Sequence, residues 1–406
     1  MQCCMSMSRV TRREFVFLCS AAAANPSPVF NSSQEILLHP RAKIAELERP
    51  RVLKAATAYL SERPETITSV PAPGSAGGLH DYYSEADYWW PDPKNPSGPY
   101  IRRDGESNPA NFTAHRELLI RLSLIVPALA AAWVLTQKSE FAAHAAAHLR
   151  AWFVEPATRM NANLQYAQAI HGVDTGRATG IIDTVHLVEV AQAAMVLERG
   201  QVLSISDADG IRSWFAEYLN WLTTSQRGRE ERDTKNNHAS CWLLQAAEFA
   251  AYTGETGVRD DCRERLKKTI LPNQVAPDGG FPLELARTKP YSYSLFNLDV
   301  LGMCAHILSD TTGDLWTYKF ANEQSLSRCF EFMIPYLANK NAWPYRHDVA
   351  YFDDLPARQP SLLLAGLAFR NPSYLEVWER LNPDPAVPEV IRNHPIRQPI
   401  LWMQQT

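Results

Sequence analysis

The sequence has little of what marks a nucleic-acid-binding, membrane-embedded or metal-dependent protein. Its 406 residues carry a formal net charge of −4 and no dense cluster of Lys and Arg, which argues against nucleic acid as the main partner. The longest apolar run, residues 124–135, is interrupted by Pro127 and is too short to cross a bilayer, so we expect no membrane anchor. No histidine lies in an H-E-x-x-H motif, and we expect neither a metal nor another cofactor.

Cysteine is also scarce. Three of the seven cysteines precede residue 20, which leaves Cys241, Cys262, Cys304 and Cys329. These four have neither the paired C-x-x-C spacing of a zinc site nor the density of a disulfide scaffold. We therefore interpret them mainly as small buried residues.

The N-terminus has the order of features found in an export signal. Arg12 and Arg13 precede an uncharged run that ends in small residues, before Pro26 and Pro28. The TRREF core is typical of a twin-arginine signal, although an amphipathic helix of the mature protein is an alternative. We expect residues 1–24 to be a signal peptide, residues 25–406 to form one domain, and the protein to be periplasmic or secreted.

Apolar residues recur at helical spacing along most of the chain after residue 112. No series of alternating strands interrupts them, and paired helices with short connections favour an array of helical hairpins. Because no fixed repeat period is present and long loops lie between hairpins, closure into an α/α toroid is favoured over an open solenoid. The predicted fold is all-α, with long aromatic loops that form a cleft. The expected helices cover residues 112–136, 139–152, 181–199, 209–223, 238–253, 258–269, 296–308, 324–336 and 359–369.

Aromatic side chains gather in the Pro-rich segment DYYSEADYWWPDP, which contains Tyr83, Tyr88, Trp89 and Trp90. Exposed aromatic faces stack on sugar rings, whose C–H faces are apolar while their edges need hydrogen bonds. A small core beneath a long loop is the alternative. We take these four residues as candidates for substrate binding.

Two further polar segments are candidates for the same cleft. In PYIRRDGESNP, the paired guanidinium groups of Arg102 and Arg103 suit a carboxylate, because a planar fork binds both of its oxygens, although a surface salt-bridge cluster is equally consistent. In NLQYAQAIHGVDTGR, four side chains bracket glycines ahead of a helix, namely Tyr166, Gln168, His171 and Arg177. Shaping of the loop explains the glycines but not these side chains.

Two consecutive hairpins carry polar groups at the start of a buried helix. NNHAS places Asn236, Asn237 and His238 directly before an apolar run, where one asparagine would suffice as a helix cap. ELARTKPYSYSLFNL places Arg287 six residues before Tyr293, again ahead of an apolar helix. Equivalent ends of neighbouring hairpins can converge on one cleft.

Together these motifs, over about residues 75–350, resemble the alginate lyase family of polysaccharide lyases. The resemblance implies an incomplete α/α toroid that cleaves a uronic-acid polymer by β-elimination. The family's Asn-His and Arg…Tyr motifs match Asn237, His238, Arg287 and Tyr293, which are therefore the expected catalytic residues. Tyr291 is a minor competitor for the role of Tyr293, and Ala239 stands where relatives commonly have glycine.

β-Elimination also explains why several hydrogen-bond donors gather at these helix starts. The C5 proton of a uronate is hard to remove while the neighbouring carboxylate is anionic, and amide, imidazole and guanidinium groups stabilise the charge that develops there. Tyr293 is the expected proton-transfer residue. If the C5 proton and the leaving O4 lie on opposite faces of the sugar, His238 is the base and Tyr293 the acid. Glu231 and Asp233 either orient His238 or cap the helix.

The expected partner is an anionic polysaccharide, alginate or glucuronan, bound by a monomeric enzyme. Asn236 and Tyr291 complete the set of expected substrate-binding residues. A glycoside hydrolase with two catalytic carboxylates is the alternative, and a non-catalytic sugar-binding protein is a third. The candidate carboxylates for hydrolysis are Glu85, Asp87, Asp92, Glu231, Asp278 and Glu284.

Overall fold

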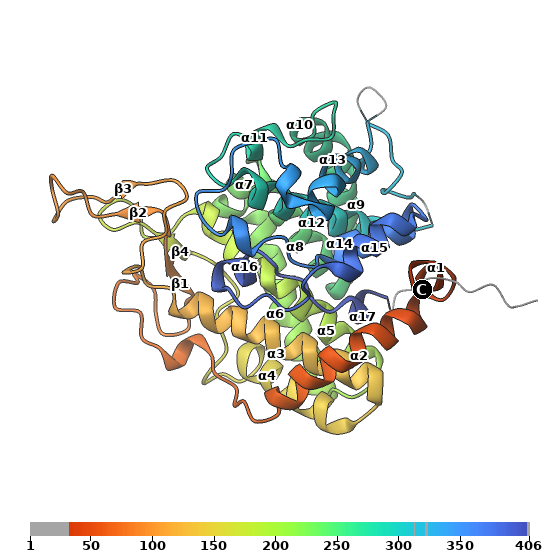
Figure 1. Cartoon of the computed structure of the whole chain (residues 1–406). Coiled ribbons are helices and arrows are strands. Elements are labelled where there is room, and N and C mark those ends of the chain that lie inside the picture. The colour runs from red at the N-terminus through yellow and green to blue at the C-terminus, as the bar shows by residue number, and fades with distance from the viewer. Residues whose placement is uncertain (1–31, 312, 321–323, 404–406) are drawn as a thin grey trace, which may run out of the picture.

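A computed structural model describes residues 32–311, 313–320 and 324–403, so the predicted signal peptide at residues 1–24 lies outside the described residues. Helices dominate the described chain, as Figure 1 shows. The longer helices are α2 (Pro40–Tyr59), α3 (Ala114–Thr136), α4 (Ser139–Phe153), α5 (Leu187–Arg199), α6 (Ile205–Thr224), α8 (Asn237–Thr253), α9 (Thr256–Arg265), α12 (Pro290–Leu308), α13 (Leu326–Ala338), α14 (Pro360–Ala368) and α15 (Pro372–Arg380). The shorter ones are α1 (Ser32–Leu38), α7 (Gln226–Arg232), α10 (Leu271–Gln274), α11 (Pro282–Leu285), α16 (Pro388–Arg392) and α17 (Pro399–Trp402).

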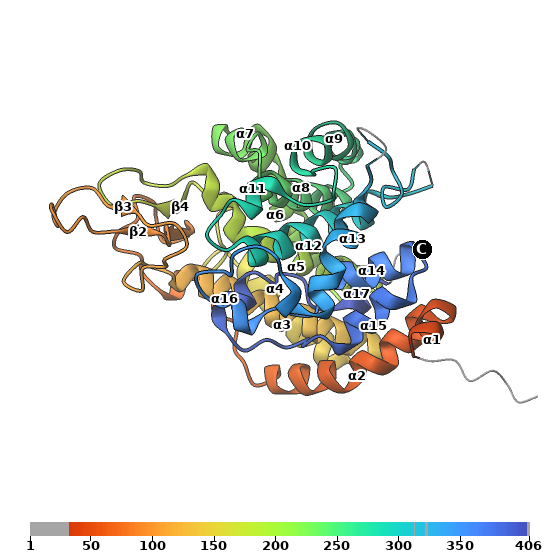
Figure 2. The ribbon, with the colours of Figure 1, turned by 45° about the horizontal axis from the view of Figure 1, so that its top comes forward.

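The helices pack as an inner row covered by an outer one. Helix α3 contacts α5, α5 contacts α8, α8 contacts α12, and α12 contacts α14, so these five form the inner row. The outer helices α4, α6, α9 and α15 pack against them, as Figure 2 shows from a second direction. The short α17 packs against α2, α3 and α5. The architecture is therefore an incomplete α/α toroid, which confirms the predicted fold class.

Helical periodicity located the core helices to within a few residues, except where the backbone departs from regular α-helix. The expected helix at 181–199 begins as a 3₁₀ segment, Ala178–His186, and continues as α5. The helix expected at 258–269 is α9 followed by a π-helical turn, Leu266–Ile270. The short helices α7, α10 and α11 and the C-terminal helices α15 to α17 were not predicted.

Two helical stretches are long and apolar enough to cross a membrane, namely Ala114–Thr136 and Ala178–Arg199. Within their most apolar windows, 67% and 94% of the residues are buried inside the protein, as expected of core helices. The expectation that this stretch is too short to cross a bilayer was wrong on length alone, because Pro127 lies buried inside the continuous 23-residue helix α3.

The four cysteines beyond the first residues are all free and buried. Cys241, Cys304 and Cys329 have no exposed surface, and Cys262 is 2% exposed. Burial in apolar surroundings raises the pKa of each thiol. This confirms their interpretation as packing residues.

Four short strands, which the sequence did not predict, organise the loops at one end of the toroid. Strand β1 (Tyr83–Glu85) pairs in parallel with β4 (Tyr166–Ala169), and β2 (Trp89–Trp90) pairs antiparallel with β3 (Ile101–Arg102). Figure 1 shows these strands projecting beside the helical core. The pairing joins the aromatic segment to both polar loops, so all three segments form one wall of a cleft.

Candidate active site

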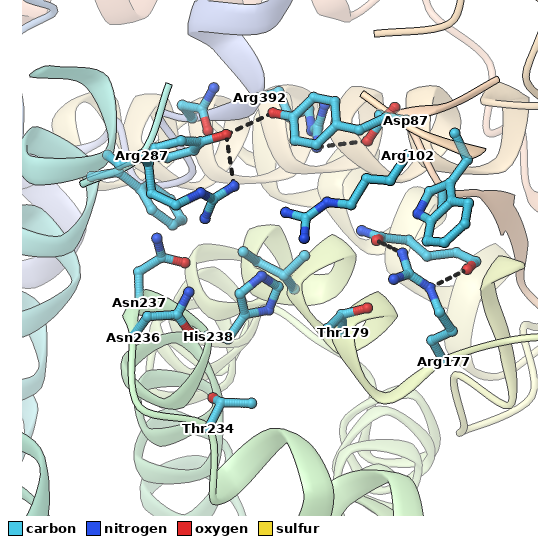
Figure 3. A pocket seen from close by; sticks show the side chains of 18 residues that line it. Asp87, Arg102, Arg177, Thr179, Thr234, Asn236, Asn237, His238, Arg287 and Arg392 are labelled. Atoms are coloured by element: carbon cyan, nitrogen blue, oxygen red, sulfur yellow. Dashed lines mark hydrogen bonds and ion pairs between the residues drawn. The ribbon is translucent and has the colours of Figure 1, made fainter. Parts of the chain in front are cut away.

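The strand-containing loops and the N-terminal ends of α8 and α12 enclose a pocket of about 310 Å³. Figure 3 shows the side chains of Asn237, His238, Arg102 and Arg287 pointing toward one another across it. The four residues expected to be catalytic all line this pocket, together with five of those expected to bind substrate. These nine are Tyr88, Trp89, Arg102, Gln168, Asn236, Asn237, His238, Arg287 and Tyr293.

The asparagines at the start of α8 are not helix caps. Asn236 precedes the helix without a side-chain capping bond. Asn237 instead donates from its backbone N–H to Glu284 Oε1 at 2.8 Å and from Nδ2 to Glu284 Oε2 at 2.7 Å. Burial raises the pKa of Glu284, and the two bonds from Asn237 oppose that rise. The second amide hydrogen of Asn237 remains for a ligand in the pocket.

His238 is oriented by a buried carboxylate. Its Nδ1 lies 2.6 Å from Oε1 of Glu231, which is fully buried, and this contact leaves Nε2 for a ligand. Burial alone would lower the pKa of His238, but the Glu231 carboxylate raises it, and the net pKa lies above 6.5. Glu231 was considered either to orient His238 or to cap the helix, and its contact with Nδ1 fits the first of these roles. Asp233 instead pairs with Arg232 and Arg265.

The Tyr293 hydroxyl contacts two other residues of the pocket, Tyr88 and Arg287. Its Oη lies 2.8 Å from Tyr88 Oη, and Arg287 Nη2 donates to it at 3.4 Å. The guanidinium carbon of Arg287 lies 4.5 Å from the centre of the Tyr293 ring. Burial and the neighbouring Tyr88 raise the pKa of Tyr293, and the positive charge of Arg287 opposes them without reversing the shift. The free enzyme therefore holds Tyr293 as a neutral hydroxyl that can donate a proton.

An aromatic and cationic wall faces these groups. Trp89 lies beneath the guanidinium of Arg177, whose carbon is 6.0 Å from the ring centre. Arg177 donates to the Gln168 carbonyl at 2.9 Å and to Gln168 Oε1 at 3.0 Å. Gln168 adopts a left-handed backbone conformation, with φ of 50°, and its Nε2 donates to the buried Asp183 at 3.0 Å. These contacts fix the side of the pocket opposite α8.

Two predicted binding residues, Tyr83 and Tyr291, are buried away from the pocket. Tyr291 has no exposed surface and donates its hydroxyl to the Tyr336 carbonyl at 2.9 Å. Tyr83 is 3% exposed and donates to Glu85 Oε1 at 2.9 Å. The structure therefore contradicts their assignment as substrate contacts, since neither side chain faces the pocket.

Three others lie near the cleft but outside the pocket. Trp90 donates its Nε1 to the Glu106 carbonyl at 2.9 Å, and Arg103 stacks on its ring, 5.0 Å from the centre. Trp90 and Arg103 thus pair with each other. Tyr166 lines a separate hollow that also contains Trp221. The structure thus places these three residues outside the pocket, and their role in binding substrate stays a prediction.

The pocket also contains residues that the sequence motifs did not indicate. Arg392, at the end of α16, lies 2.8 Å from Asp87, which also accepts from Arg116 at 2.6 and 3.0 Å. Of the carboxylates considered for hydrolysis, only Asp87 lines the pocket. Both of its oxygens are paired with Arg116 and Arg392. Arg177, noted in the same sequence segment as Gln168, lines the pocket too. The remaining unpredicted lining residues are Ala86, Thr179, Ile182, Thr234, Phe296 and Asn393.

An α/α toroid with Asn, His, Arg and Tyr side chains gathered in one pocket is the arrangement expected of a polysaccharide lyase, and the comparisons with known proteins establish that class. The sequence model of the alginate lyase family matches residues 66–343, and the chain belongs to that family. Comparison with curated proteins gave no match.

Two solved structures illustrate the likeness. An alginate lyase from Bacteroides ovatus is 27% identical, with a TM-score of 0.76 over 92% of this chain and 97% of that one. A histidine-to-alanine variant of alginate lyase A1-III, complexed with a tetrasaccharide, is 13% identical, with a TM-score of 0.54 over 93% of this chain and 99% of that one. The second likeness concerns the fold alone. Family membership confirms that the protein is a polysaccharide lyase and removes the hydrolase and non-catalytic alternatives.

Proposed function

We propose that the protein cleaves alginate by β-elimination in the pocket between α8, α12 and the strand-containing loops. The observation that carries the proposal is the convergence of one tyrosine hydroxyl with amide, imidazole and guanidinium groups in a single pocket. Asn237, His238 and Arg287 neutralise the C5 carboxylate of the uronate as negative charge develops on it. Alginate is the favoured polymer because the chain belongs to the alginate lyase family and resembles alginate lyases in structure.

In the proposed reaction, Tyr293 protonates the leaving O4 as the bond from C4 to O4 breaks and the double bond between C4 and C5 forms. Its raised pKa favours this acid role. When the C5 proton lies on the opposite face of the sugar, the neutral form of His238 removes it through Nε2, because Nδ1 is held by Glu231, and Asn237 and Arg287 then neutralise the carboxylate without it. When both atoms share a face, Tyr293 first loses its proton to solvent and then performs both transfers, as the phenolate that takes the C5 proton and as the acid that gives it to O4. Arg287 favours the phenolate that this second route needs.

The substrate class follows from the charge of the donors. We expect cleavage of free polyuronates, with the unsaturated product followed by its ultraviolet absorbance. Methyl esterification removes the carboxylate charge that Arg287 and its neighbours stabilise, so the esterified polymer should be cleaved at least about 100-fold more slowly, the effect of losing one such donor. A neutral glucan should give no product. Release of reducing ends from the glucan without ultraviolet absorbance would contradict elimination.

The contrast between Trp89 and Trp90 tests whether the aromatic wall binds sugar. Trp89→Ala should raise KM about fivefold, equivalent to a loss of about 1 kcal/mol of binding, with kcat nearly unchanged. Trp90→Ala is the matched control, because its ring pairs with Arg103 outside the pocket and its loss should leave KM unchanged. Steady-state kinetics on alginate measures both. Equal effects of the two substitutions would contradict a specific role for Trp89.

A further inference from the structure

One carboxylate contacts two of the arginines that line the pocket, Arg102 and Arg287. Asp104 Oδ1 accepts from Arg102 Nη2 at 2.6 Å and from Arg287 Nη2 at 2.9 Å. Its Oδ2 accepts from Arg287 Nε at 3.3 Å and from Thr288 Oγ1 at 3.0 Å. Arg102 and Arg287 line the pocket, whereas Asp104 does not. Asp104 therefore touches the pocket only through other side chains.

The charge of Asp104 is permanent at the pH of any ordinary assay. Burial would raise its pKa, but the hydrogen bonds from Arg287, Thr288 and Arg102 lower it to about 2. Its side chain is 26% exposed, and it pairs with arginines that are 57% and 23% exposed. An ionised carboxylate thus lies between two guanidinium groups that come from different parts of the chain.

The next residue, Gly105, allows this contact to form. Its φ is +80°, in the left-handed region that disfavours residues with a Cβ. A Cβ there would lie 2.4 Å from Thr288 Oγ1 and 3.2 Å from Val349 Cγ2. The turn after β3 can therefore approach the segment before α12 closely only with glycine at this position. Because Gly105 lets the turn approach Thr288, the neighbouring Asp104 comes within hydrogen-bonding distance of Arg287.

The pairing orients Arg287. Asp104 engages the edge of the guanidinium formed by Nε and Nη2, while Nη2 also reaches the Tyr293 hydroxyl. A guanidinium has five N–H donors in a fixed plane, so fixing one edge determines where the other points. The remaining donors on Nη1 are left for a substrate carboxylate.

We propose that Asp104 is a positioning residue for elimination, which acts by holding Arg287 against Tyr293. The inference rests on the proposed function, in which Arg287 stabilises the charge of the substrate carboxylate. Asp104 ties the turn after β3 to the segment before α12, so the pocket side of Arg287 is fixed before substrate enters. A misplacement of about 1 Å at such a group can cost about 100-fold in turnover.

Asp104→Asn tests the proposal because it removes the charge while retaining the shape of the side chain. We expect kcat on alginate to fall about 100-fold. KM should not rise, because the variant pocket has one more uncompensated positive charge and the substrate is a polyanion. A residue that merely stabilised the fold would not separate kcat from KM in this way.

Glu106→Gln is the matched control, since it makes the same change of charge two residues away. Glu106 is 61% exposed, and its nearest charged partner is Arg103 at 4.0 Å. Its kcat and KM should both equal those of the wild type. Gly105→Ala is a second variant, which retains both charges but displaces the turn from Thr288, and its kcat should fall as well. Circular dichroism and thermal unfolding establish that each variant is folded.

The decisive measurement is a double-mutant cycle with Arg287→Ala, scored by long incubations that detect residual product. If Asp104 acts through Arg287, adding Asp104→Asn to Arg287→Ala should change kcat by less than about twofold. A wild-type kcat in folded Asp104→Asn or Gly105→Ala, or full multiplication of the two losses, would overturn the proposal. Full activity of Arg287→Ala alone would instead refute the proposed role of Arg287.

Discussion

Tyr293→Phe should lose nearly all turnover of alginate, with a fall in kcat of about 10³-fold, because it removes the only atom proposed to protonate O4. Binding of the polymer should stay close to wild type, since the ring and its contact with Arg287 remain. The rate of appearance of the unsaturated product gives kcat, and isothermal calorimetry of the inactive variant gives the affinity.

Tyr291→Phe is the control for Tyr293→Phe, because it removes the same atom two residues away on the same helix. The Tyr291 hydroxyl binds the Tyr336 carbonyl in the interior, so its loss should destabilise the fold by about 1 kcal/mol and leave kcat unchanged. If Tyr291→Phe were inactive and Tyr293→Phe active, the catalytic tyrosine would be Tyr291, and its assignment to Tyr293 would be wrong.

Substitution of Asn237, His238 or Arg287 by alanine should lower kcat about 10²- to 10³-fold in each case, with a smaller change in KM. These donors strengthen their bonds as the substrate carboxylate gains charge, so they contribute more to the transition state than to the bound substrate. Steady-state kinetics on alginate separates the two parameters.

Asn236→Ala provides the comparison for these three variants. Asn236 lines the same pocket but is not among the groups proposed to neutralise the carboxylate, and we expect its loss to raise KM more than it lowers kcat. If all four variants changed KM and kcat alike, positioning and catalysis would not be separable in this pocket, and the assignment of charge neutralisation would be wrong.

The helical core could be predicted from sequence because the pattern of apolar residues is local. The strands could not, because β2 and β3 have two residues each and their pairing joins distant segments. Trp89 and Trp90 were treated alike, yet neighbours on a strand point to opposite sides. Tyr291 and Tyr293 lie about 200° apart around α12, which explains why only one of them reaches the pocket.

The sequence located the donors and offered Glu231 as one group that could orient His238, which its contact with Nδ1 supports. It did not locate the acids that hold the other donors. Glu284 was considered as a catalytic group of a hydrolase, whereas it binds Asn237. Asp104 has the same relation to Arg287. Spacing along the chain gives no hint of these last two pairs, because each joins segments that lie far apart in the sequence. Arg392 was missed for the same reason.

The ion pair between Asp87 and Arg392 affects the order in which the enzyme becomes active during folding. Asp87 precedes the first inner helix α3, and Arg392 follows the outer helix α15, so their contact forms only after the whole ring has assembled. Contacts of such large sequence separation form late, since the entropy of closing a long loop must be overcome first. A nascent chain therefore lacks a complete pocket until its last helices have packed. Catalytic activity in this protein reports the folding of the entire toroid.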